Sequence, residues 1–131
     1  MKNDNEKMVK LYSYLLWSST QSQIFHRQTK GYLHTTLNEY YSDLIDSYDA
    51  LIEAYQGKYG LLTGMTNLVV KDFEKIEDVI EHLTIIAKQV EQYENTCEDS
   101  YIISLCDDIL KLVYSTKYKL TDLCGDCNCE G

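Results

Sequence analysis

The chain has 131 residues and a formal net charge of −9, from 12 basic and 21 acidic side chains. Its length suits one domain with a real core, and its 44% hydrophobic content excludes a disordered chain. The acidic balance argues against nucleic-acid binding, which depends on neutralising phosphates, and favours cations as partners. Proline is absent and glycines number 6, so long helices are expected.

Apolar residues at helical spacing predict four helices, at about residues 5–28, 32–56, 72–95 and 98–120. A longer connector, residues 58–71, separates the second helix from the third. Its sequence, KYGLLTGMTNLVVK, is too apolar for a free loop, so we expect a short helix there, lying on a dimer surface. The predicted fold is an all-α four-helix bundle over residues 1–123, followed by a Cys-rich tail at 124–131.

The inner faces of these helices differ in character. The first begins apolar, becomes small and polar, and ends on a histidine, through Met8, Leu11, Tyr12, Leu15, Ser19, Ser22 and His26. The second has an apolar face too wide for one neighbour, so we expect it to pack against a further helix, such as the same helix of a second copy. We expect this helix to end at Gly57 and Gly60. The third opens with an acidic first turn, Asp72 and Glu74, as the helix dipole favours.

Four good metal ligands stand at an unusual spacing in the first half of the chain: His26, His34, Asp49 and Glu53. On one continuous helix His34 and Asp49 would be roughly 22 Å apart, so the four cannot converge within one copy. His26 and His34 can face each other across a short break at Gly31, and Asp49 and Glu53 share a helix face. A two-fold dimer with antiparallel helices would bring the histidines of one chain onto the carboxylates of the other. Considered separately, His26 would be interpreted as a core residue, and Asp49 and Glu53 as part of a solvent-exposed helix face.

The stretch from about Gln23 to Gly57 resembles the Dps-type mini-ferritins, and is similar to the short Dps-like proteins of tailed phages. The family places one histidine late in the first helix, a second at the start of the next, and then D-x3-E, and the residues that match are His26, His34, Asp49 and Glu53. The resemblance implies a ferritin-like bundle that assembles from two-fold dimers into a hollow homo-oligomer, a dodecamer. It also implies iron sites between subunits, where these residues bind Fe(II) and act as a ferroxidase, so that iron is stored and oxidative damage is limited.

The sequence departs from this family in two respects, and it also lacks a motif of ordinary ferritins. The gap between the two histidines is shorter than usual, and the ordinary ferritin E-x-x-H motif is missing, which disfavours an intrachain di-iron site. The acid expected four residues after His34 is Asn38, a weak ligand for hard iron, and the adjacent Glu39 projects about 100° away. The site would then bind iron more weakly, hold one metal, or favour another divalent ion such as zinc. The alternative function is a non-enzymatic, Dps-derived structural or virion-associated protein.

His82 lies in the third predicted helix beside four acids, Glu74, Glu77, Asp78 and Glu81. We interpret this stretch as a solvated face and His82 as a surface residue. The alternative is an inner acidic surface on which mineral could nucleate.

The last eight residues contain three of the five cysteines, as C-x2-C-x-C: Cys124, Cys127 and Cys129. A structural zinc site needs a fourth ligand, so Cys97, Cys106, Asp126 or another chain would have to contribute. We expect reduced thiols, with metal capture or bonding between subunits as alternatives. The polar N-terminus and the lack of an apolar run of about 18 residues predict a cytoplasmic protein outside the membrane. For a phage-encoded chain this is the host cytoplasm, with the virion as the alternative.

Overall fold

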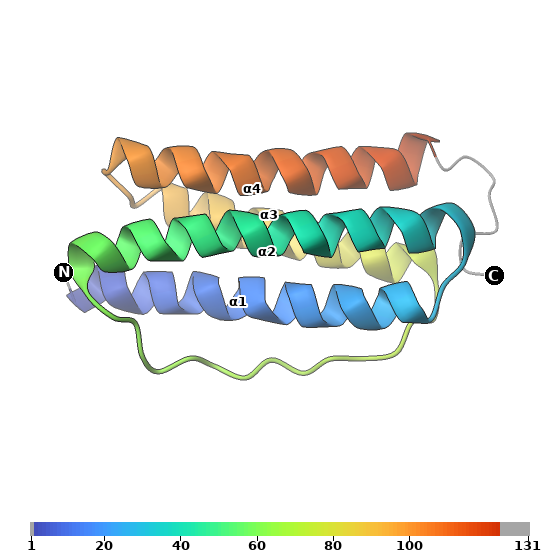
Figure 1. Ribbon diagram of the computed structural model, residues 1–131, viewed down its shortest axis with the longest axis horizontal. Helices are drawn as coiled ribbons and strands as arrows, with labels where there is room; N and C mark the ends of the chain where they lie inside the picture. The colour runs from blue at the N-terminus through green and yellow to red at the C-terminus, as the bar shows by residue number, and fades with distance from the viewer. Residues whose placement is uncertain (1, 124–131) are drawn as a thin grey trace.

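The computed structural model describes residues 2–123, with side chains from Asn5 onward, and the regular secondary structure of this part is helical, without strands. Four α-helices pack side by side as a bundle (Figure 1), and a short π-helical turn follows the last of them. Their bounds are Lys2–Arg27 (α1), Gly31–Tyr59 (α2), Ile76–Glu94 (α3), Ser100–Tyr118 (α4) and Lys119–Leu123 (η1). The prediction of an all-α fold with four helices is confirmed. None of the helices described is long and apolar enough to cross a membrane.

The helices enclose one core. α1 packs on α2 and α3, and α4 packs on the same two helices, so that α2 and α3 occupy one diagonal of the bundle. Each helix contributes fully buried aliphatic side chains, for example Leu15, Leu44, Leu83 and Ile109. α2 and α3 run in the same direction, so the connector between them travels back along the whole bundle (Figure 1). This long crossover decides the topology, because the other connections are short turns.

The connector, residues 60–75, is extended, so the short helix expected within it is wrong. Polar side chains of α1 hold its backbone: the Trp17 Nε1–H donates to Val69 O at 2.9 Å, and the Gln21 amide bonds both the N–H and the C=O of Lys71 at 2.8 Å. Gly64 adopts a φ of 86°, which leaves the helical region. Side chains thus take several of the connector's backbone hydrogen bonds, and the segment stays extended without forming a helix.

Two helix boundaries also differ from the prediction. α2 continues through Gly57, and the cap is Gly60, at φ 96°, whose N–H bonds the Gln56 carbonyl. α3 begins at Ile76, not near residue 72: Lys75 is still extended, and the N–H of Phe73 donates to the side-chain oxygen of Gln28 at 2.6 Å. The acidic first turn therefore consists of Glu77 and Asp78, whereas Asp72 and Glu74 precede the helix.

The inward face predicted for α1 is buried at Met8, Leu11, Leu15, Ser19 and Ser22, whereas Tyr12 and His26 are half-buried. Ser13 and Gln21 are buried as well, although they face away from the core, because the connector covers them. The cysteines of the C-x2-C-x-C motif, Cys124, Cys127 and Cys129, lie outside the described residues.

Candidate functional site

The turn between α1 and α2 brings His26 and His34 together. The Thr29 hydroxyl bonds the Phe25 carbonyl at 2.8 Å and closes the last turn of α1, and Gly31, at φ 66°, starts α2 in the opposite direction. The two imidazole rings then stack, with centroids 3.8 Å apart and planes inclined by 24°. Both residues are half-buried.

The hydrogen bonds of the two rings are reciprocal and fix their chemistry. Nδ1 of His26 lies 2.8 Å from the carbonyl oxygen of His34, and Nδ1 of His34 lies 2.6 Å from that of His26. A carbonyl only accepts, so each Nδ1 carries a proton. In the neutral ring the lone pair is then on Nε2, the nitrogen that remains for a metal, and a backbone carbonyl orients many metal-binding histidines in this manner.

The stacking of the two rings limits how one ion could bind the Nε2 atoms of both His26 and His34. Imidazole lone pairs lie in the ring plane, and the two planes here are nearly parallel. A single ion bound by both Nε2 atoms therefore requires the rings to tilt out of the stack. Tyr41 packs edge-on against His26 at 5.6 Å between centroids, and its hydroxyl donates to Asn38 Oδ1 at 3.0 Å. The amide oxygen at the position where an acid was expected is thus already engaged.

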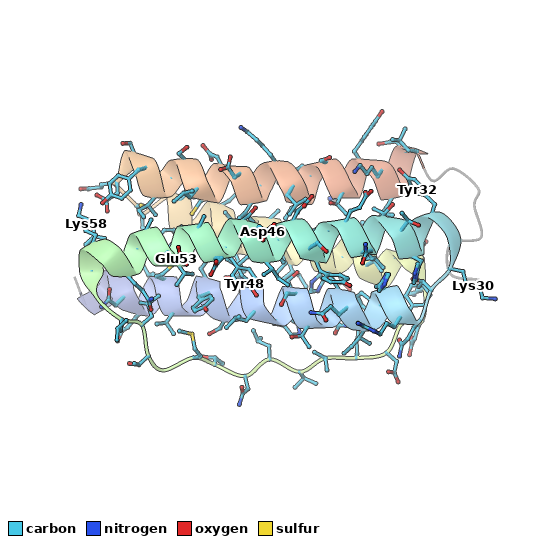
Figure 2. The ribbon with its side chains drawn as sticks, viewed as in Figure 1. Lys30, Tyr32, Asp46, Tyr48, Glu53 and Lys58 are labelled. Atoms are coloured by element: carbon cyan, nitrogen blue, oxygen red, sulfur yellow. The ribbon has the colours of Figure 1, made fainter. Side chains whose placement is uncertain are left out.

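The predicted carboxylate ligands lie elsewhere on α2. Asp49 and Glu53 are exposed, and Glu53 is near the Lys58 end of the helix, opposite the end marked by Lys30 and Tyr32 (Figure 2). Within the described part of the chain, no group of three or more His, Cys, Asp or Glu side chains is placed to hold a metal. One copy therefore brings together the two histidines and separates them from the two acids.

Asp49 nevertheless shares a stripe of α2 with His34, and Glu53 lies one turn further along at the edge of this stripe. At about 100° per residue, Tyr41, Ile45 and Asp49 fall within a wedge of about 80° that also contains His34. The side chain of Ile45 is exposed, and that of Tyr41 is half-buried. This stripe, together with the adjoining side of α1, is a face onto which a second molecule could pack.

His82 is the residue that sequence reasoning misplaced. It was interpreted as a surface residue, but it is 4% exposed and lies among α1, α2 and α3. Its Nε2 is 2.7 Å from Ser18 Oγ, which in turn is 2.8 Å from the Tyr40 hydroxyl. Ser18 and Tyr40 are fully buried, so this is a polar network inside the core. Of the four acids predicted to form a solvated face, Glu74, Glu77 and Glu81 are exposed, whereas Asp78 is half-buried and lies 3.9 Å from Lys71 Nζ.

The environment of His82 keeps it neutral. Burial lowers the pKa of His82 to about 3, and the charge of Lys71 acts in the same direction. Its ring packs 4.5 Å from the Trp17 indole and 6.2 Å from Phe25, between centroids. A signal for this burial was present in the sequence: His82 follows Val79 by three residues and precedes Ile86 by four, which places it on the apolar stripe of α3.

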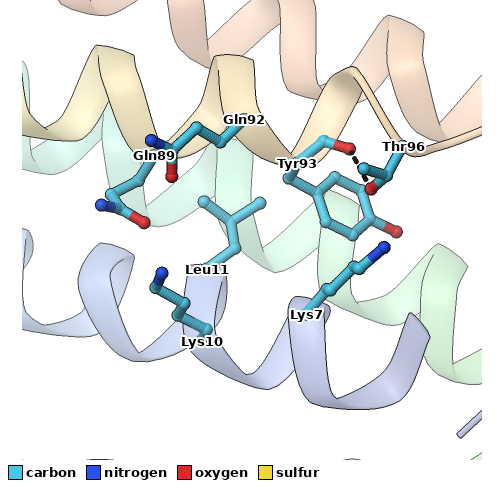
Figure 3. Close-up of a pocket in the computed structure, with 7 residues that line it drawn as sticks. All are labelled: Lys7, Lys10, Leu11, Gln89, Gln92, Tyr93 and Thr96. Atoms are coloured by element: carbon cyan, nitrogen blue, oxygen red, sulfur yellow. Dashed lines mark hydrogen bonds between the residues drawn. The ribbon is translucent and has the colours of Figure 1, made fainter. Parts of the chain in front are cut away.

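A further pocket, of about 200 Å³, lies between α1 and α3 (Figure 3). Lys7 and Lys10 border it from α1, and Gln89 and Gln92 from α3, with Leu11 between them. Lys7 precedes His26 by 19 residues, roughly 28 Å along the helix, so this pocket is separate from the histidine pair.

These features define an all-α bundle with a stacked histidine pair at one end and a hydrogen-bonded histidine in the core. Residues 26–120 match the family of unknown function DUF5856, and the chain belongs to this family. The matched region begins at His26 and includes His34, Asp49, Glu53 and His82. No curated protein and no solved structure matches the chain.

Proposed function

We propose that this protein is a Dps-like, ferritin-like iron-binding protein that oxidises Fe(II) at sites shared between subunits and sequesters the product in a hollow homo-oligomer. The observation that carries the proposal is the His26–His34 pair, whose Nδ1 atoms are both committed to backbone carbonyls and whose Nε2 atoms are left for a metal. Nitrogen ligands held in this manner suit Fe(II), and also zinc or another divalent ion.

The topology supports the ferritin-like part of the proposal. Ferritin-like bundles have one long crossover connection, and here residues 60–75 form one between two helices that run in the same direction (Figure 1). The pair of histidines also lies late in α1 and early in α2, as the resemblance to the Dps family requires.

The position of the acids supports a site shared between two subunits. A second copy packed antiparallel on the stripe of α2 would carry its Asp49 and Glu53 toward His26 and His34 of the first, and each dimer would hold two such sites. Two Fe(II) ions bound there would give two electrons to one hydrogen peroxide, which with two protons leaves as two waters. The chain's own part is to position the ligands, and its charge of −9 attracts the cation.

The test is Fe(II) oxidation by hydrogen peroxide in the absence of oxygen, followed by ultraviolet absorbance. We expect the wild-type protein to oxidise Fe(II) faster than a protein-free blank, and His26→Ala combined with Asp49→Ala to return the rate to that of the blank. Asp46→Ala is the matched control, because Asp46 is an exposed acid on the same helix, about 60° further round. A wild-type curve that coincides with the blank would refute the enzyme.

A mixing experiment tests whether the site is shared. Subunits with His26→Ala lack one half of each site, and subunits with Asp49→Ala lack the other. A dimer made from one of each contains one intact site if ligands come from both chains, so unfolding and refolding the mixture should restore activity that neither variant has alone. If the mixture stays inactive while the wild type is active, the site lies within one chain.

Asn38 favours a second candidate, a non-enzymatic structural protein with a degenerate metal site. Its amide oxygen accepts a bond from Tyr41 in place of the acid that the family pattern calls for. Such a protein would assemble normally but would leave Fe(II) oxidation at the rate of the blank.

A further inference from the structure

The buried network around His82 fixes which of its ring nitrogens carries the proton. The Tyr40 hydroxyl is fully buried, and its hydrogen-bond partner is Ser18 Oγ, at 2.8 Å. A buried O–H group needs an acceptor, so Tyr40 donates to Ser18, and Ser18 in turn donates to His82 Nε2 at 2.7 Å. Nε2 is therefore the unprotonated nitrogen, and the neutral ring of His82 carries its proton on Nδ1.

The Nδ1–H group of His82 opens onto a pocket. Within the described residues it bonds no protein group, and it is not one of the enclosed polar atoms without a partner, which are Ser22 Oγ and Glu94 Oε2. A solvent path therefore reaches Nδ1. His82 lines a pocket of about 200 Å³ between α1, α3 and the connector, and the other residues of its wall are Trp17, Gln21, Lys71, Asp78, Glu81 and Ile85.

Asp78 adds an acceptor to the donor of His82. Its side chain is only 13% exposed, and its ion-pair partner, Lys71 Nζ, is 3.9 Å from Oδ1, which is too far for a hydrogen bond. Asp78 and His82 are four residues apart on α3, so they share one face of the helix, with Cβ atoms about 6 Å apart. The pocket thus presents a hydrogen-bond donor and an acceptor side by side, and the fold uses neither of them.

The rest of the pocket suits a small flat ring. The Trp17 indole packs on His82 at 4.5 Å between centroids, and its Nε1–H bonds Val69 O, so its orientation is fixed. Ile85 adds an aliphatic wall. A volume of about 200 Å³ holds one aromatic ring with its substituents, since an apolar cavity of about 150 Å³ already takes benzene. The ligand is therefore a single ring.

The charges of the pocket disfavour an anion. Its wall contains two carboxylates, those of Asp78 and Glu81, and one ammonium group, that of Lys71. The balance is one negative charge, in a protein whose net charge is −9. A neutral ligand that satisfies the donor and the acceptor fits this environment better than a phosphate or a carboxylate.

We propose that this pocket binds a single-ring nitrogen heterocycle whose edge carries a hydrogen-bond acceptor beside a donor, as pyrimidine bases do. The acceptor of the ligand takes the Nδ1–H of His82, the adjacent N–H of the ligand donates to Asp78, and the ring lies on the Trp17 indole. Bases outside a duplex are generally recognised in this way, by bonds to one edge and by stacking on an aromatic side chain. A free base and a nucleoside share the edge, and the sugar of a nucleoside would extend toward solvent.

This site is separate from the proposed metal site. Trp17 precedes His26 by nine residues, roughly 13 Å along α1, and the pocket involves neither histidine of the stacked pair. Binding of the heterocycle requires no metal, so it is measured on protein treated with a chelator. The two sites can then succeed or fail independently of each other.

The first test uses the fluorescence of Trp17, which is the single tryptophan of the chain. We expect saturable quenching by cytosine and by uracil, corrected for the quenching of free tryptophan in the same buffer. Unsubstituted pyrimidine is the matched control ligand, because it has the ring and the acceptors but no N–H for Asp78. It should bind at least about tenfold more weakly. Cytidine binding as tightly as cytosine would identify nucleosides as ligands, and binding of cytosine alone would identify the free base.

The second test changes the protein and follows cytosine binding by calorimetry. Asp78→Ala removes the acceptor from a half-buried position, and we expect affinity to fall at least about tenfold. Glu77→Ala is the matched control, because Glu77 is the adjacent, exposed acid and does not line the pocket. His82→Phe keeps a ring but removes the donor, and it should weaken binding to a similar degree. Circular dichroism checks that each variant is folded.

Three results would overturn this inference. The first is the absence of saturable binding of cytosine and uracil up to their solubility limits. The second is pyrimidine binding as tightly as cytosine, and the third is equal affinity of Asp78→Ala and Glu77→Ala for cytosine. Heterocycle binding by a protein that leaves Fe(II) oxidation at the rate of the blank would uphold the pocket and refute the ferroxidase. Ferroxidase activity without heterocycle binding would do the reverse.

Discussion

The three histidines of this protein occupy two contrasting environments. His82 is in the core, where Nε2 bonds Ser18 and the ring packs on Trp17 and Phe25. His26 and His34 are half-buried at the end of α1 and the start of α2, where each Nδ1 bonds a carbonyl and each Nε2 remains for a ligand. The difference is which nitrogen the protein uses for its own structure.

The contrast shows that the role of a histidine depends on which ring nitrogen the fold already uses, as well as on its exposure. A buried histidine whose Nε2 is committed to a hydroxyl stabilises the fold, and its neutral state is enforced by the core. A histidine fixed through Nδ1 presents the other nitrogen outward at little conformational cost. His82 therefore contributes to stability, the His26–His34 pair is proposed to bind a ligand, and four changes test this division.

The largest expected effect is the loss of stability in His82→Ala. The substitution leaves a cavity under Trp17 and removes one partner of Ser18 in the core, so we expect the free energy of unfolding to fall by about 3 kcal/mol. Urea denaturation measures it. In the half-buried pair, His34→Ala should lower the free energy of unfolding by no more than about 1 kcal/mol. Equal losses for the two variants would erase the proposed distinction.

The second effect is a pH dependence of stability that belongs to His82. The unfolded chain protonates this residue near pH 6.5, whereas the folded protein does so only near pH 3. The unfolded state thus binds more protons between these values, and stability is complete above pH 6.5 and declines as the pH falls toward 3. At about 1.4 kcal/mol per pH unit, the loss from pH 6.5 to pH 5 is about 2 kcal/mol.

The comparison for this pH effect is His82→Gln, which keeps a polar group near Ser18 but does not titrate. Urea denaturation at pH 7 and pH 5 should show the wild type losing about 2 kcal/mol more than the variant. Parallel losses would mean that carboxylates elsewhere govern the acid response.

The third effect concerns metal binding at the His26–His34 pair. Asn38→Asp supplies a carboxylate one turn beyond His34, and we expect divalent metal to bind about tenfold more tightly, because hard ions prefer charged oxygen. Calorimetric titration with Co(II) and Fe(II), the latter without oxygen, provides the measurement. Asn95→Asp adds the same charge at an exposed site near the end of α3 and serves as the control. If both variants gain equally, the effect is general charge and not ligation.

The smallest effect is expected from Tyr40→Phe. The change removes the far hydroxyl of the buried network but leaves the bond between Ser18 and His82, so about 1 kcal/mol of stability should be lost. Tyr114→Phe removes a hydroxyl from an exposed bond to Glu91 and should be nearly silent. Thermal or urea unfolding that ranks Tyr114 above Tyr40 would show that the network contributes little.

Periodicity predicted the helices well, because a buried stripe such as Val79, Leu83, Ile86 and Val90 recurs with the helix itself. It placed the start of α3 too early, since the segment before Ile76 is held extended by Gln28, a residue 45 positions away from Phe73. It also placed His82 at the surface, because charged neighbours in the sequence outweighed its position on the stripe. Contacts between distant residues decided both outcomes.

The sequence by itself determined that the chain forms four helices, that His26 and His34 stand on either side of a tight turn, and that a largely uncharged segment joins α2 to α3. Local spacing and glycine placement are sufficient for these features. Only the tertiary structure decided which nitrogen of each histidine is committed, that Ser18, Tyr40 and His82 meet in the core, and that the connector lies extended on α1. Hydrogen bonds between groups far apart in the chain depend on how the helices pack, and packing is a property of the whole fold.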